Sequence, residues 1–337
     1  MSTPPIFGSE AENPIVVQLR SQRGKQGFAG LENRLPGGTL NQGDVVFTLE
    51  EDVEADVVII QNYLEYDTEI SAREGYIFKW DNEPIVRQPF ARGLDRIYTH
   101  IPSGDPRLHT APPILDWWVA RSHDELEAME PPPKSKPMSA IASTKTLIAG
   151  HHLRAEFVNR VASEVPVIDV FGQGREHPLE DKWDGLAPYR YSLAIENSST
   201  DDYWTEKIAD CFLSYTVPLY FGAKNIGGYF PPESFIWLPI DQPESALAVI
   251  RDVLENDDWK ARLPALTSAR ELVLKRYSLG SQIMSIVRAE RSRILNAPRT
   301  SRVVHGRRIR PGGWIRGVGL LANVKNQLGR RLTRLKN

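Results

Sequence analysis

Residues 191–207 read YSLAIENSSTDDYWTEK and form the densest cluster of polar and charged groups in the 337-residue chain. The run 191–195 is short and mostly apolar, as expected for a buried parallel strand. Residues that favour helix N-termini follow at 198–202. Residues of the buried type then recur at helical spacing: Trp204, Ile208, Cys211 and Phe212. The stretch predicts a strand, a loop and a helix at about 203–214, the repeating unit of a doubly wound α/β domain.

This strand–loop–helix junction carries side chains that suit a nucleotide. Glu196 and Asn197 end the strand, so they stand at the carboxyl edge of the sheet, where ligands bind in this class of fold. In the predicted helix, Tyr203, Glu206 and Lys207 share one face. The helix N-terminus and Lys207 would attract phosphate oxygens, Glu206 would accept ribose hydroxyls, and Tyr203 would offer a hydroxyl or a stacking face. The alternative is an ordinary capped helix whose charged residues are solvated.

The pattern resembles the donor motif of the α1,3-fucosyltransferases, glycosyltransferase family 10, in a bacterial-type form without a transmembrane anchor. Residues 196–198 (ENS) and 202–207 (DYWTEK) are similar to the family's FENS and DYVTEK, and 217–222 (VPLYFG) and 231–236 (PPESFI) extend the likeness. It is strongest over about 139–295 and weak before that range. The resemblance implies a GT-B fold, in which two Rossmann-like α/β domains face a cleft, and GDP-fucose as the donor substrate.

The resemblance also implies which residues hold the donor. Direct contacts are expected from Asn197, Tyr203, Glu206 and Lys207, and secondary candidates are Glu196, Ser198 and Gly222. Arg154, at the start of a helix expected at 153–163, would reach the diphosphate, which a guanidinium binds in a bidentate manner. His151 and His152 are interpreted as polar residues of the preceding loop.

Neither a cofactor nor a metal is expected at the transfer site. The seven histidines and the single cysteine, Cys211, show no metal-ligand spacing, and Asp201-Asp202 is not a spaced Asp-x-Asp pair. Gly172-Gln173-Gly174 lacks the third glycine of a dinucleotide fingerprint, so a tight turn is predicted there. In the family that the sequence resembles, Lys and Arg neutralise the diphosphate instead of a metal.

Transfer with inversion needs a general base that takes the acceptor proton from the face opposite the diphosphate. Residues 80–84 (WDNEP) resemble a short Glu-containing motif that supplies this base in the family, which makes Glu83 the candidate. Asp81 and Glu74 are the next candidates. The alternative for Glu83 is a loop carboxylate that only precedes a proline.

Short β-type runs alternate with helix-capable stretches on both sides of the proline-rich segment 130–137 (EPPPKSKP), which we interpret as a stiff linker that is neither helix nor central strand. Runs in the first part predict a parallel sheet covered on both faces. We therefore expect a Rossmann-like acceptor domain at 1–137, a GDP-sugar donor domain at 138–297, and a basic amphipathic tail at 298–337. A final helix at about 281–295 would cross back over the cleft.

Composition is that of a globular chain, and no apolar run is long enough for a membrane span. A single cysteine and no secretory-type N-terminus predict a cytoplasmic protein. Eleven Lys and Arg and no acid lie in 299–337, although the whole chain has a net charge of −2. An apolar stripe within 314–337 predicts a helix that binds an anionic membrane surface, with nucleic acid as the less favoured partner.

The expected function is transfer of L-fucose from GDP-fucose to a hydroxyl of an acceptor glycan, with an α-1,3 or α-1,4 linkage, in the biosynthesis of lipopolysaccharide or another glycan. Two alternatives stay open. One is a related glycosyltransferase that uses another nucleotide sugar, and the other is a non-catalytic sugar- or polyanion-binding protein on the same fold.

Overall fold

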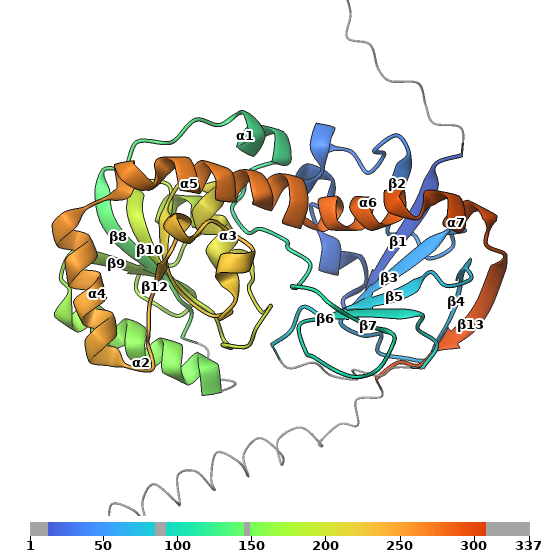
Figure 1. The fold of residues 1–337 in the computed structure, drawn as a ribbon, viewed down its shortest axis with the longest axis horizontal. Helices are drawn as coiled ribbons and strands as arrows, with labels where there is room; N and C mark the ends of the chain where they lie inside the picture. The colour runs from blue at the N-terminus through green and yellow to red at the C-terminus, as the bar shows by residue number, and fades with distance from the viewer. Residues whose placement is uncertain (1–12, 85–91, 145–148, 308–337) are drawn as a thin grey trace, which may run out of the picture.

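The computed structural model describes residues 13–84, 92–144 and 149–307. Two α/β units lie side by side, each built on a parallel sheet (Figure 1). Within these residues, no helix is both long and apolar enough to cross a membrane. The membrane-binding segment predicted at 314–337 lies outside the described residues.

The first unit contains a six-stranded sheet in the order β2-β1-β3-β5-β6-β7. All neighbouring strands are parallel, and their bounds are β1 Ile15–Ser21, β2 Val45–Thr48, β3 Val57–Gln61, β5 Ile77–Trp80, β6 Arg96–Thr99 and β7 Leu108–Thr110. These strands confirm the parallel sheet predicted from the apolar runs. Between them, the described chain forms turns and short 3-10 helices rather than long crossover helices.

Both faces of this sheet are covered, but by elements from the far end of the chain. On one face, α6 (Leu279–Ala289) and α7 (Arg291–Asn296) contribute Ile283, Val287 and Ile294 to the core around β1 and β3. On the other face, β4 (Thr68–Arg73) pairs antiparallel with β13 (Arg299–Val304) and encloses a second core. The first domain therefore cannot be complete without residues 279–304.

The strand β13 corrects the predicted domain limits, because a tail was expected to start at residue 298. Residues 299–304 instead form a six-residue ladder with β4, in which Val304 is buried. Arg299 and Arg302 pair with Asp56 and Asp95 of the first domain. Counting basic residues along the sequence missed this strand, since its charges are matched by acids far away in the chain.

The second unit is a five-stranded parallel sheet in the order β12-β11-β10-β8-β9. Its strands are β8 Lys136–Ile141, β9 Ile168–Phe171, β10 Tyr189–Ile195, β11 Val217–Phe221 and β12 Ile236–Trp237. Its helices are α2 Ala149–Glu164, α3 Glu206–Leu213, α4 Pro243–Asn256 and α5 Trp259–Leu272. When the strands of each unit are numbered in chain order, with β4 omitted, both sheets contain the strand order 2-1-3-4-5. In sheets with this order, ligands bind at the carboxyl edge, beside the first strand.

Two connections cross between the units. The first passes through 111–122, α1 (His123–Ala128) and an extended stretch into β8, and the second is the run from α5 through a π-helix (Val273–Tyr277) into α6 (Figure 1). They meet where the backbone N–H of Leu279 donates to the carbonyl of Leu115. The single helix expected at about 281–295 is divided into α6 and α7, which pack on the first unit, and the crossing is made by the run from α5 to α6.

The proline-rich linker ends earlier than its composition predicted, because Lys136 and Pro137 open β8, a central strand. β9 pairs with β8 only from Met138 onward, so Pro137 has one sheet neighbour, β10. A proline is tolerated at the start of a strand because its missing N–H interrupts few ladder bonds there.

Candidate active site

Two adjoining cavities lie between the units, at the carboxyl edges of both sheets. One has a volume of about 430 Å³ and is lined mainly by the first unit and the linker segment 113–118. The other has a volume of about 720 Å³ and is lined mainly by the second unit. Three residues line both cavities: Trp118, Asn197 and Glu206. A molecule with two parts could therefore extend from one cavity into the other.

Arg154 is fixed at the edge of the larger cavity by the packing of α2. Gly150, in the first turn of this helix, approaches the backbone of Asn197 so closely that a Cβ would lie 1.9 Å from the Asn197 carbonyl oxygen. One turn later, Arg154 is 6% exposed and donates to Asn197 Oδ1 at 2.7 Å. Burial lowers the pKa of this guanidinium, which nevertheless stays charged at neutral pH.

In the described chain, α2 begins at Ala149, four residues earlier than predicted, so His151 and His152 are helical rather than part of a loop. His151 lines the larger cavity. The sequence favours a later start because the histidines break the apolar pattern, whereas the helix is defined by the close contact of Gly150 with Asn197.

The helix α3 begins at Glu206 with Thr205 as its N-cap, which corrects the predicted start at about 203. The cap-type residues 198–202 form a loop instead. Within it, Asp202 adopts a left-handed φ of 62° and is held by Asn225 and Tyr229. Tyr203 therefore precedes the helix and does not share a helical face with Glu206 and Lys207.

Glu196 organises this N-terminus from the end of β10. Its buried carboxylate accepts the Thr205 N–H at 2.7 Å and the Thr205 hydroxyl at 2.8 Å, and it lies 3.0 Å from Lys207 Nζ. Burial raises the pKa of Glu196, and Lys207 opposes that rise. Glu196 therefore positions the first turn of α3 rather than lining either cavity.

Lys207 and Glu206 face the cavities as a charged cluster with Lys182. Lys207 Nζ lies 3.3 Å from Glu206, and Lys182 Nζ lies 3.7 Å from Glu206 and 3.0 Å from the buried Asp210. Burial alone would lower the pKa of Lys207, but Glu196 and Glu206 outweigh it, so this pKa is raised. Burial would raise the pKa of Glu206, but Lys207 and Lys182 outweigh it and lower this pKa. The cluster is fully charged at neutral pH.

Lys182 is a site residue that the sequence reasoning missed. It lies in a 3-10 turn before β10, and its ammonium sits 4.8 Å from the centre of the Trp118 ring. Together with Arg154 and Lys207 it gives the larger cavity three cations. No local motif marks it, because only the packing of this turn beside α3 brings it to the cavity.

Tyr203, predicted to touch the donor, is 2% exposed and lines neither cavity. Its ring lies 4.8 Å from that of His100, which follows β6 in the first unit. In this structure Tyr203 is a contact between the two units. A direct role with the donor stays a prediction.

Two of the secondary candidates for donor binding, Gly222 and Ser198, lie against other protein groups in this structure. A Cβ at Gly222 would lie 2.2 Å from the Tyr220 hydroxyl and 2.6 Å from Glu196 Cγ, so glycine leaves the space that Glu196 occupies. The Ser198 hydroxyl lies 3.4 Å from the Thr200 hydroxyl in the same loop. Gly172-Gln173-Gly174 forms the predicted turn, and Gly172 and Gln173 line the larger cavity.

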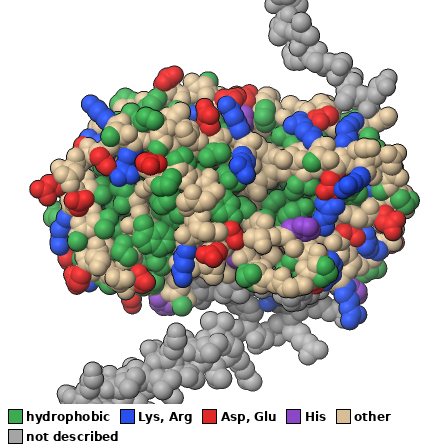
Figure 2. Space-filling model, viewed as in Figure 1, with side chains coloured by type: hydrophobic (Ala, Val, Ile, Leu, Met, Phe, Trp, Pro, Cys, Tyr) green, Lys and Arg blue, Asp and Glu red, His purple; other side chains and the backbone are tan. Residues whose placement is uncertain are grey.

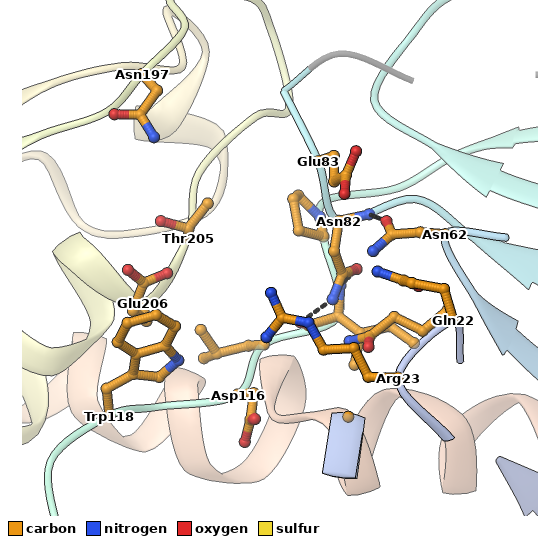
Figure 3. A pocket seen from close by; sticks show the side chains of 15 residues that line it. Gln22, Arg23, Asn62, Asn82, Glu83, Asp116, Trp118, Asn197, Thr205 and Glu206 are labelled. Atoms are coloured by element: carbon orange, nitrogen blue, oxygen red, sulfur yellow. Dashed lines mark hydrogen bonds between the residues drawn. The ribbon is translucent and has the colours of Figure 1, made fainter. Parts of the chain in front are cut away.

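The smaller cavity has a wall of amide side chains from the first unit, including Gln22, Asn62 and Asn82 (Figure 3). Asn82 is held on both sides, because its N–H donates to Asn62 Oδ1 at 2.7 Å and its side chain exchanges hydrogen bonds with the backbone of Ile114. Glu83 follows Asn82 and lines the same cavity. Figure 3 places Glu83 and Asn197 on facing walls.

The other two candidate bases line neither of these two cavities. Asp81 is buried in an ion pair with Lys79, and burial raises the pKa of Asp81 while it lowers the pKa of Lys79. Glu74 precedes β5 and so lies at the amino edge of the sheet, opposite the cavities. Of the three carboxylates, Glu83 alone lines the smaller cavity.

Among the residues that the structure describes, no group of three or more His, Cys, Asp or Glu side chains could hold a metal ion. The three cations of the larger cavity could themselves neutralise an anionic group. A site without a cofactor or metal stays a prediction.

Comparison with solved structures defines the class of fold. An α1,3-fucosyltransferase solved with GDP-fucose superimposes with a TM-score of 0.55 over 88% of this chain and 94% of that protein, at 18% identity. A further α1,3-fucosyltransferase structure superimposes with a TM-score of 0.54. The chain therefore has a GT-B glycosyltransferase fold, as predicted.

Comparison of sequences relates part of the chain to one family of glycosyltransferases. Residues 132–259 match the description "Glycosyltransferase family 10 (fucosyltransferase) C-term". An α-(1,4)-fucosyltransferase of Arabidopsis thaliana is 34% identical over 92 residues, and an α-(1,3)-fucosyltransferase of Helicobacter pylori is 36% identical over 58. These alignments span 26% and 17% of this chain but only 23% and 12% of the relatives. The match to this family model therefore lies within the second unit and the segment that leads into it.

Proposed function

We propose that the chain is an inverting fucosyltransferase, which transfers L-fucose from GDP-fucose to a hydroxyl of an acceptor glycan and forms an α-1,3 or α-1,4 linkage. The carrying observation is the cluster of Arg154, Lys182 and Lys207 around a cavity at the carboxyl edge of the second unit. The fucosyltransferases named among the relatives support this donor.

In this proposal the diphosphate of the donor lies in the larger cavity. Arg154 and Lys207 contact its oxygens, and Lys182, which also lies beside Glu206, adds positive charge. The N–H groups at the start of α3 point their positive dipole end in the same direction. As the bond between fucose and the diphosphate breaks, these groups stabilise the negative charge on the departing GDP. Asn197 and Glu206, which line both cavities, would contact the sugar or the ribose.

Glu83 acts from the opposite wall as the general base. It takes the proton of the acceptor hydroxyl while that oxygen attacks the anomeric carbon of fucose, and the GDP oxygen leaves with the bonding electrons. Attack from the face opposite a β-linked diphosphate gives an α-linked product. The products are the fucosylated glycan, GDP and one proton, which Glu83 releases.

The experiment that tests the proposal combines donor binding with turnover. Calorimetry compares GDP-fucose, GDP-mannose and UDP-galactose, and a GDP-release assay then screens GDP-fucose against a panel of acceptor glycans. We expect GDP-fucose to bind most tightly and to release GDP only with some acceptors. Preference for another nucleotide sugar would favour a related glycosyltransferase. Binding of glycans without GDP release from any donor would favour a non-catalytic binding protein.

Variants of the cation cluster test the donor site. Lys207→Ala should abolish transfer and weaken GDP binding about a hundredfold, as expected for loss of a charge-assisted contact of about 3 kcal/mol. Because Lys207 also neutralises the buried Glu196, the double variant Glu196→Gln/Lys207→Met removes Lys207 without leaving that carboxylate unpaired. Lys224→Ala, at an exposed lysine outside both cavities, is the matched control. Normal turnover by Lys207→Ala at saturating donor would exclude this donor site.

We further propose that residues 314–337 hold the enzyme at an anionic membrane surface, which rests on the charge and apolar pattern of that segment. The face drawn in Figure 2 has acidic and basic side chains interspersed, without a broad basic patch among the described residues. Sedimentation with vesicles of 30% phosphatidylserine should retain the full chain and release it at high salt, whereas a chain ending at residue 307 should stay in solution. Equal retention of both chains would contradict this role.

A further inference from the structure

We infer that Arg23 selects an acidic acceptor, one that carries a carboxylate or phosphate group close to the reacting hydroxyl. The inference rests on the proposed function, since it assigns the smaller cavity to the acceptor. Arg23 follows β1 at the carboxyl edge of the first sheet and lines this cavity. Figure 3 shows its side chain projecting into the cavity, across from Trp118 and Glu206.

Arg23 differs from its basic neighbours in lacking an acidic partner. Arg20 pairs with Glu51 at 3.4 Å, Lys25 with Glu50 at 2.6 Å, and Arg34 with Asp116 at 2.7 Å. Among the described residues, no carboxylate lies within 4.0 Å of the Arg23 guanidinium. Arg23 is exposed at this cavity, and a guanidinium that makes no hydrogen bond or ion pair with the described residues has its donors available for an anionic ligand.

The backbone at Arg23 is held in place, so the side chain starts from a defined position. The Arg23 N–H donates to the Ser21 hydroxyl at 3.1 Å, and that hydroxyl donates to the Gly24 carbonyl at 3.1 Å. Gly24 has a left-handed φ of 55°, which glycine adopts without strain. A fixed starting point reduces the entropy that Arg23 loses when it binds a ligand.

The donor diphosphate does not account for Arg23. Arg154, Lys182 and Lys207 line the larger cavity, and Arg23 does not. Two carboxylates of the smaller cavity are already neutralised, Glu206 by the lysines and Asp116 by Arg34. Glu83, the third acid of this cavity, forms no ion pair with Arg23, and as the proposed base it would need the acceptor hydroxyl beside it. The free positive charge of this cavity is therefore directed at the acceptor.

The remaining walls suit a sugar ring. The amides of Gln22, Asn62 and Asn82 can exchange hydrogen bonds with hydroxyl groups. Trp118 is 61% exposed, which is high for so large an apolar side chain, and it forms the facing wall. Its backbone N–H is fixed by Asp210 Oδ1 at 3.0 Å. Together these groups describe a site for an acidic sugar, with its ring against Trp118 and its anionic group at Arg23.

The test uses the full chain with GDP present and pairs of glycans that differ only in an acidic group: a neutral glycan and its uronic acid, sialic acid or phosphate counterpart. Binding is followed by saturation-transfer NMR and turnover by GDP release. For at least one pair, the acidic member should bind about tenfold more tightly. Arg23→Gln should abolish this preference, Arg23→Lys should restore part of it, and the exposed Arg92→Gln should leave it unchanged.

Three outcomes would overturn the inference: equal binding of every pair by the wild type, an unchanged preference in Arg23→Gln, or weaker GDP binding in Arg23→Gln, which would place Arg23 on the donor. Failure of the proposed function gives a different result. In that case the protein would not bind GDP-fucose and no GDP would be released. The preference for acidic glycans could still be measured by NMR.

Discussion

The two sheets share a strand order, yet their carboxyl edges carry different chemistry. Each edge contains a buried ion pair of a lysine with a carboxylate. In the first unit, Lys79 and Asp81 are 1% and 3% exposed, and neither lines the smaller or the larger cavity. In the second unit, Glu196 is buried but Lys207 is 19% exposed and lines the larger cavity. The first pair is closed, whereas the second presents its cation to the larger cavity.

The pKa shifts of the two lysines differ in the same way as their exposure. Burial dominates for Lys79 and Asp81, and it shifts both pKa values toward the neutral forms. Lys207 faces two carboxylates, which raise its pKa despite burial. A lysine that must bind a diphosphate has to be charged before the ligand arrives, and the second edge meets this condition. The comparison separates a buried lysine inside the first unit from a partly exposed lysine that lines a cavity, although both pair with a buried carboxylate.

The largest expected effect concerns Glu83, the acid on the first edge. Glu83→Gln removes the base but keeps the size of the side chain, so kcat for GDP release should fall about 10²- to 10⁴-fold. The affinity for GDP, measured by calorimetry, should not change, because we propose that the second edge binds the donor. Glu74→Gln, at the opposite edge of the same sheet, is the control. A kcat within threefold of wild type in Glu83→Gln would remove Glu83 from the mechanism.

The next effect concerns the closed pair. Lys79→Met leaves Asp81 without its partner in the core, which should lower the free energy of unfolding by about 3–5 kcal/mol. GDP affinity should stay that of wild type when measured on folded protein. Chemical denaturation and calorimetry on the same sample compare the two quantities. If Lys79→Met instead weakened GDP binding as much as Lys207→Ala, the distinction between a closed and an open pair would be lost.

A smaller effect is expected at His100, where the two units touch. Burial lowers the pKa of this imidazole to about 4, below its unfolded value near 6.5. The unfolded chain therefore binds more protons between these two values, and the free energy of unfolding decreases as the pH falls from 6.5 to 4. The loss should amount to about 1–3 kcal/mol. The free energy of unfolding, measured by chemical denaturation at each pH, should change less across this range for His100→Gln than for wild type. Equal slopes against pH would contradict the burial of a neutral His100.

Prediction from sequence was most successful where chemistry is local. The strand at 191–195, the polar residues that end it and the parallel sheets were all found, because apolar runs and strand-end residues are close together in the chain. Arg154, Asn197, Glu206 and Lys207 were placed at one cavity correctly. Their assignment to the donor itself remains a prediction, as does the role of Glu83.

The errors occurred where distant segments decide the structure. The helix α3 begins later than predicted because Glu196, nine residues before Thr205, accepts hydrogen bonds from Thr205 and so holds that residue as the N-cap. Lys182 and Trp118 reach the site only through packing between units, and β13 depends on β4, about 230 residues earlier along the chain. None of these contacts has a sequence period or a short motif that could reveal it.

The most direct test of the account is hydrogen–deuterium exchange of the wild-type chain with and without GDP. If the second edge binds the diphosphate, GDP should slow exchange in peptides covering 149–154 and 197–207, and leave peptides covering 22–28 and 61–64 unchanged. Protection confined to the first edge, with none at 197–207, would contradict the central claim that the open Lys207 pair marks the donor site.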